Sequence, residues 1–145
     1  MPIKLKDLIT NFIKNNSSVL QFLDKTEVGY QDGKEVIPSF AEMMNKTQYN
    51  PALGLGFASV LQLSDNRNFY EQYELEEIGR LYSSLIELQD SNLDAYIESA
   101  NFEFAVLDKT DKAKQIATAG IEKAMQKVNE LKKLLDLIEK EEYGA

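Results

Sequence analysis

The sequence predicts an all-α protein, a single-domain bundle of five or six helices that spans residues 1–145 and ends in a long C-terminal helix. Three observations support this fold class. Apolar residues recur every three or four positions through most of the chain, which is the period of an amphipathic helix. Apolar residues make up 43% and charged residues 28% of the chain, as in an ordinary globular protein. The C-terminal segment carries an unbroken heptad pattern of apolar residues.

The N-terminal segment predicts either one kinked helix or two short ones. A polar run, NNSS at residues 15–18, separates two apolar groups that each have helical spacing. The first group is Leu5, Leu8, Ile9, Phe12 and Ile13, and the second is Val19, Leu20, Phe22 and Leu23.

A small β-hairpin is expected near residues 28–37. Asp32-Gly33 is a dipeptide that favours a type I′ turn, because both central positions of that turn need positive φ. The alternative is a polar loop. The strand residues would be Val28, Tyr30, Val36 and Ile37. A capping box, Ser39 with Glu42, then predicts a short helix that ends near Lys46.

The stretch YNPALGLGFASVLQL, residues 49–63, is predicted to be a helix. Asn50 suits the N-cap and Pro51 the first helical position. A phosphate-binding loop would need a preceding strand and, in the Walker type, Gly-Lys-Ser/Thr, and neither is present. We therefore interpret Gly54 and Gly56 as helix residues at a point where another helix crosses closely.

Two further amphipathic helices are expected at residues 69–88 and 93–107. Phe102 and Val106 lie off the apolar stripe of the second helix, so this helix is expected to be contacted on two sides. The stripe of the first comprises Tyr70, Tyr73, Ile78, Leu81, Tyr82, Leu85 and Leu88. The inward residues of the second are Leu93, Tyr96, Ile97, Ala100, Phe104 and Leu107.

The last helix carries three heptads whose apolar seam is Ala117, Ile121, Ala124, Val128, Leu131, Leu135 and Ile138. A parallel self-dimer is one interpretation of this pattern. In such a pair Lys127 would face Lys132 of the other copy, which is repulsive, and Leu134 would face Glu139. We therefore favour antiparallel packing of the seam on the 93–107 helix of the same chain, and the sequence leaves open whether the seam is intramolecular or intermolecular.

A helical hairpin is also indicated by AYIESANFEF, in which Tyr96 precedes the small Ala100 by four positions, and by DKAKQIATAG after a short turn. The second segment offers small residues for close helix packing at Ala113, Ala117 and Gly120. Residues 93–125 thus resemble a single tetratricopeptide-type hairpin, although no second copy lies about 34 residues earlier. The resemblance implies a packing unit of the kind that holds other proteins, and it carries over no binding residue.

The residue types exclude much chemistry, and the sequence predicts no enzyme, no metal and no cofactor. Without cysteine and histidine there is no disulfide, no thiolate nucleophile, no histidine base and no usual zinc ligand. DSNLDAYIESAN, residues 90–101, has part of a calcium-loop pattern but carries Ala95 and Asn101 where that loop needs glycine and glutamate. A carboxylate pair among Glu71, Glu74 and Glu77 would support a small acid–base enzyme only if it were buried.

The charge pattern predicts a protein partner. The net charge of −8 disfavours a nucleic acid. Between residues 71 and 98 there are eight acids and one base, an excess that suits a basic partner or a solvated helix face. No apolar run approaches the roughly 20 residues that span a bilayer, so we expect no membrane contact and no signal peptide, and a cytoplasmic location, or a host cell or particle if the protein is viral.

The function that the sequence favours is a non-enzymatic protein–protein interaction or assembly module, with self-association as one form. The alternatives are an acidic inhibitor that occupies a nucleic-acid-binding site of an enzyme, and a structural subunit of a large assembly such as a virus particle. The partner, the source organism and the oligomeric state are left open. The candidate partner-binding residues form two groups: Phe69, Tyr70, Tyr73, Glu74 and Glu77, and on the terminal helix Met125, Leu134 and Leu137.

Overall fold

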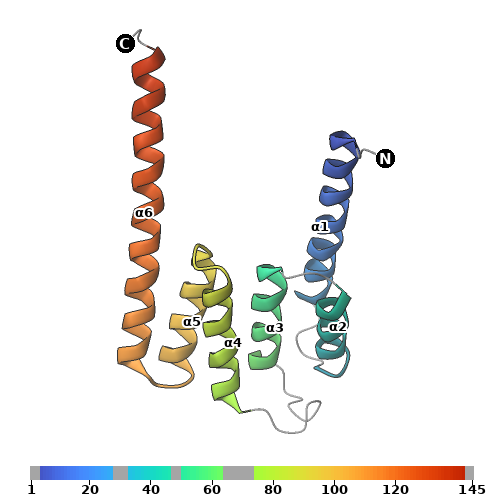
Figure 1. Cartoon of the computed structure of the whole chain (residues 1–145). Helices are drawn as coiled ribbons and strands as arrows, with labels where there is room; N and C mark the ends of the chain where they lie inside the picture. Colours follow the sequence, from blue (N-terminus) through green and yellow to red (C-terminus); the bar gives the residue numbers. More distant parts are fainter. Residues whose placement is uncertain (1–3, 28–32, 47–49, 64–73, 143–145) are drawn as a thin grey trace. The chain divides into compact units, whose positions relative to one another are not determined.

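A computed structural model describes residues 4–27, 33–46, 50–63 and 74–142. These ranges form six α-helices and no strand, which confirms the all-α prediction and the long C-terminal helix (Figure 1). The helices are α1 (Leu5–Glu27), α2 (Gly33–Lys46), α3 (Pro51–Leu63), α4 (Leu75–Leu88), α5 (Leu93–Ala105) and α6 (Thr110–Glu142). The chain divides into two compact units, Met1–Glu74 and Leu75–Ala145. The single-domain assignment stays a prediction.

The predicted hairpin is wrong over its second half, because α2 begins at Gly33 and includes Val36 and Ile37. Residues 28–32 lie outside the described residues. Two strands alone are only marginally stable, whereas the helix continues without a break to Phe40, which is fully buried. The sequence signal was ambiguous, since an aspartate before glycine suits a helix N-cap as well as a turn.

The N-terminal segment is one helix, so of the two predicted forms the single helix is confirmed. The hydroxyl groups of its polar run remain compatible with helix. Ser17 Oγ donates to the carbonyl oxygen of Ile13 at 2.9 Å, and Ser18 Oγ donates to that of Asn15 at 2.7 Å. Because each hydroxyl bonds to the preceding turn, it does not divert the backbone from its own ladder.

The first unit is organised around α3, which packs against α1 and α2. The predicted start of α3 is confirmed. Asn50 precedes Pro51, the first residue of the helix, and its side-chain Oδ1 accepts a hydrogen bond from the backbone N–H of Ala52 at 2.9 Å. A Cβ atom placed on Gly56 would lie 3.0 Å from Leu23 of α1 and 3.0 Å from the Phe40 ring of α2. Gly56 therefore allows the close approach of helices that the sequence suggested.

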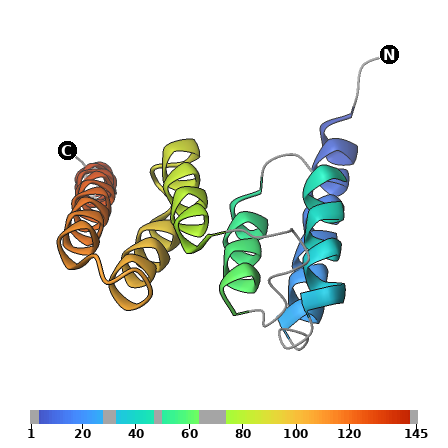
Figure 2. The same cartoon turned by 90° about the horizontal axis from the view of Figure 1, so that it is seen from below.

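In the second unit α5 lies between α4 and α6 (Figure 2). The prediction that this helix is contacted on two sides is confirmed. Phe102, which the sequence placed off the inward stripe, is fully buried, and its ring lies tilted against that of Tyr82 of α4 with 5.5 Å between the ring centroids. Ile97 and Phe104 were expected to point inward but are exposed, because α5 directs Ala95, Ser99 and Phe102 toward α4 instead.

None of the described helices has both the length and the apolar character needed to cross a membrane.

Candidate functional site

The acidic and aromatic group predicted from the sequence lies largely beyond the structural description. Residues 64–73, and with them Phe69, Tyr70 and Tyr73, lie outside the described residues. Glu74 directly precedes α4 and is exposed. Glu77 is exposed in the first turn of that helix, with its carboxylate 3.8 Å from the guanidinium group of Arg80.

The second predicted group, Met125, Leu134 and Leu137, lies on the exposed surface of α6, and each side chain is more than half exposed. These three residues flank the apolar seam of the same helix.

The turn between α5 and α6 is fixed by local hydrogen bonding. The backbone N–H of Lys109 donates to the carbonyl oxygen of Glu103 at 2.8 Å, and Asp108 adopts a positive φ of 55°. Aspartate tolerates this left-handed conformation better than most residues. The chain therefore reverses within a few residues, and α6 runs back antiparallel to α5.

Two ion pairs hold α6 at the sides of this hairpin. Lys112 Nζ lies 3.0 Å from the carboxylate of Glu103, which is fully buried in α5. Lys123 Nζ donates to Asp90 in the α4–α5 turn at 2.9 Å. This hydrogen bond lowers the pKa of Asp90 and raises the pKa of Lys123 from their ordinary values.

The close packing between the two helices depends on Gly120. A Cβ atom placed there would lie 2.8 Å from the Cβ of Tyr96, a distance that real Cβ atoms essentially never show. Gly120 and Ala113 are the buried residues of α6 among those described. They are seven residues apart, so α5 packs against one flank of α6 rather than against the heptad seam itself.

A groove of about 250 Å³ lies beside this contact. None of the residues that line it is charged. Its rims, Ile97 on α5 and Ile121 on α6, are 65% and 63% exposed. The lining residues are Leu93, Tyr96, Ile97 and Ala100 from α5 and Ala117, Gly120, Ile121 and Ala124 from α6.

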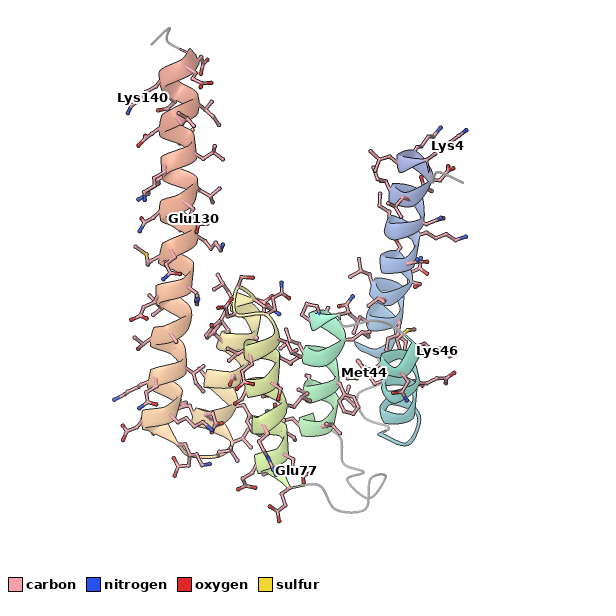
Figure 3. All side chains as sticks on the ribbon, viewed as in Figure 1. Lys4, Met44, Lys46, Glu77, Glu130 and Lys140 are labelled. Carbon is pink, nitrogen blue, oxygen red and sulfur yellow. The ribbon has the colours of Figure 1, made fainter. Side chains whose placement is uncertain are left out.

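Beyond Ala124, α6 continues without a neighbouring helix in its unit. We call residues 125–142 the overhang. At 1.5 Å per residue it is about 27 Å long, and every one of its residues is exposed. Figure 3 shows side chains projecting on all sides of this part of the helix, Glu130 and Lys140 among them.

The groove and the apolar seam of the overhang form one continuous apolar surface, which we call the α6 strip. The seam residues Ile121 and Ala124 line the groove, and the seam then proceeds along the overhang through Val128, Leu131, Leu135 and Ile138. A contiguous exposed apolar surface of this kind is typical of a site where a protein binds another protein.

The sequence prediction for the seam is therefore partly wrong. The antiparallel packing of α6 on α5 is confirmed, but it uses the flank with Ala113 and Gly120. Of the seam residues from Ile121 to Ile138, Ala124 is half-buried and the others stay exposed. The groove itself was missed, because Leu93 and Ile97 were assigned to the core. A signal was present, since α5 carries more apolar residues than its one buried stripe can use.

The titratable groups near the α4–α5 contact respond to their surroundings. Burial, and then the charge of Glu98, raise the pKa of Tyr82 to about 12. The pKa of Glu98 is itself raised, first because neighbouring atoms shield its carboxyl group from water and then because Asp94 lies one turn away. Neither Tyr82 nor Glu98 lines the groove.

Within the described ranges, no cluster of three or more acidic side chains could hold a metal ion. Comparison of the chain with protein families, curated proteins and solved structures gave no match.

Proposed function

We propose that the protein is a non-enzymatic protein–protein interaction or assembly module that binds a helical segment of another chain along the α6 strip. The observation that carries this proposal is the continuity of the apolar surface from the groove onto the overhang. Binding of an amphipathic helix in an apolar groove uses residues spaced by three, four and seven along one face, which is the spacing of the seam.

The dimensions and chemistry of the groove support a protein ligand over a small molecule. Its volume of about 250 Å³ lies below the roughly 300–1,000 Å³ of ordinary small-molecule pockets. Such pockets also carry a few convergent polar groups that orient the ligand, and no charged residue lines this groove. Apolar side chains from a second helix match this lining.

The experiment that tests the proposal places a photo-reactive amino acid in the α6 strip. The probe replaces Leu131 in the full-length protein, expressed in the cell type that makes it. A matched control carries the same probe at Lys133, which lies on the opposite side of the overhang. We expect a discrete protein adduct from position 131 and none from position 133, because only position 131 faces the bound helix.

A second substitution tests whether the adduct depends on the α6 strip. Ile138→Asp introduces a charge into the α6 strip one heptad beyond the probe and should abolish the adduct. If no protein is cross-linked from position 131, or if the adduct survives Ile138→Asp, the α6 strip is not the binding surface and the proposal is wrong.

A further inference from the structure

We infer that the helix bound by the α6 strip is the overhang of a second copy of this chain, paired antiparallel about a two-fold axis between residues 129 and 130. This inference rests on the proposed function and names its partner. A single chain carries both an apolar groove between α5 and α6 and an apolar seam along the overhang. The α6 wall of the groove and the overhang belong to one continuous helix, so the overhang cannot fold back into its own groove.

The seam residues match each other in this register. Ile121 of one copy meets Ile138 of the second, and Val128 meets Leu131. Between them the small Ala124 meets the large Leu135, so the smallest seam residue of the contact faces a large one, as in a well-packed core. Every seam residue from 121 to 138 is then covered by an apolar partner.

The off-seam leucines of the overhang also find partners in this arrangement. Leu134 lies two heptads after Gly120, and Leu137 lies two heptads after Lys123, so both are on the flank of α6 against which α5 packs. Like flanks face each other in an antiparallel pair. The two leucines of one copy therefore come beside the exposed Leu93 and Ile97 of the other.

Charge excludes the other simple arrangements. A parallel pair places Lys127 against Lys132 of the second copy, and flanking charges of this kind set the orientation of paired helices. An antiparallel pair shifted by one heptad toward the C-terminus places Lys132 against its own symmetry mate and leaves Ile121 beyond the end of the other copy's α6. The opposite shift places Lys127 against its own symmetry mate and sets Ile138 against Lys114. The proposed register brings the stem of Lys132 beside Met125 and that of Lys127 beside Leu134, with no like charges opposed.

The distribution of net charge also favours contact through α6. This helix has seven lysines and seven acids, so the rest of the chain carries the whole net charge of −8. Residues 75–109, which form α4 and α5 with their turns, hold eight acids and two bases. An antiparallel pair joins two neutral α6 helices and places these two acidic segments at opposite ends. An isologous contact of this kind closes on itself as a two-fold dimer.

The test uses single cysteines, for which the cysteine-free chain is a clean background. Ile121→Cys and Ile138→Cys are prepared separately in the full chain, one of them labelled with ¹⁵N, then mixed and oxidised. In the proposed dimer these two positions face each other. Each is about 25 Å from its own symmetry mate, because 17 residues along a helix separate them, and a disulfide cannot bridge that distance.

We expect a cross-linked heterodimer in the mixture, at roughly ten times or more the yield of either variant alone. Lys133→Cys, on the opposite side of the overhang, should cross-link to neither. Cross-linking of each variant with itself would show a parallel pair. A preferred bond between Val128→Cys and Ile138→Cys would show the shifted register. Either result, or no cross-link at all, overturns the inference.

Failure here is distinct from failure of the proposed function. If the photo-probe at Leu131 gives an adduct with a different protein while the cysteine mixture gives no heterodimer, the α6 strip binds another partner and only the self-association is wrong. If the photo-probe gives no adduct and no heterodimer forms, both are wrong.

Discussion

The two halves of α6 carry the same heptad seam but have different surroundings. In the first half, residues 110–124, the flank next to the seam has the small residues Ala113 and Gly120, and α5 packs there. In the second half, the corresponding flank carries Leu134 and Leu137, and no helix of the unit covers it. A heptad pattern therefore predicts an apolar seam, whereas the size of the flanking residues determines which neighbouring helix can approach.

The largest change in stability is expected from a substitution in the first half of α6, where α5 packs. Lys112→Met removes the cation beside the buried carboxylate of Glu103. Removing one partner of a buried ion pair costs roughly 3–5 kcal/mol, and we expect the lower end of that range because the Lys112 side chain is 47% exposed and partly screened by water. The free energy of opening, measured by hydrogen exchange of the α5 amides, should fall accordingly. Lys114→Met, an exposed neighbour, is the control and should change it little. An equal, small change in both variants would show that the ion pair does not hold the hairpin.

A smaller effect is expected at the helix crossing. Gly120→Ala forces the Tyr96 backbone away from α6, and overpacking of this kind costs about 1–3 kcal/mol, offset in part by the better helix propensity of alanine, up to about 1 kcal/mol. Gln126→Ala, the control, introduces alanine in the overhang, where no helix packs against it, and should leave the stability unchanged or slightly raised. The same hydrogen-exchange measurement checks both. Stabilisation of α5 by Gly120→Ala would contradict the close approach.

The smallest effect concerns pH. The folded protein raises the pKa of Glu98, so folding favours its protonated form. That contribution to stability is complete below the ordinary glutamate pKa and is lost as the pH rises through the raised value. Glu98→Gln should therefore match the wild type in acid and be more stable at pH 7, by at most about 1 kcal/mol because the side chain is exposed.

Urea unfolding across this pH range checks the difference between the two proteins. A parallel titration of tyrosine absorbance should show the pKa of Tyr82 moving down from about 12 in the variant, since the charge of Glu98 is one cause of its elevation. A stability difference that is constant with pH would contradict the assigned cause.

The sequence predicted the fold class and most helix positions because they depend on local patterns. The start of α3 at Asn50 and Pro51 is an example. The features that the sequence could not predict depend on how the helices pack against one another. The two-residue signal at Asp32-Gly33 was overridden by the helix that buries Phe40. On α5, several apolar faces compete, and only the packing with α4 determines that Phe102 is buried and Ile97 exposed.

The candidate site was predicted in part for the same reason. Met125, Leu134 and Leu137 are found on the exposed surface of α6, as the spacing indicated. The groove, which lies nearer the start of α6, requires α5 to pack on one flank of the helix. The small residues at Ala113 and Gly120 carried that information. It could be recognised only with the close contact between Gly120 and Tyr96 in view.

The most direct test of the account is the solution mass of the full chain by light scattering at low and high salt, for the wild type, Leu131→Asp and Lys133→Asp. We expect twice the chain mass of 16.5 kDa for the wild type and for Lys133→Asp in both salts, because an apolar contact is not screened by ions. Leu131→Asp should be monomeric with its helix content retained. A wild type that is monomeric at both salts, or a Leu131→Asp variant that remains dimeric, would contradict the pairing of two copies through the α6 strip.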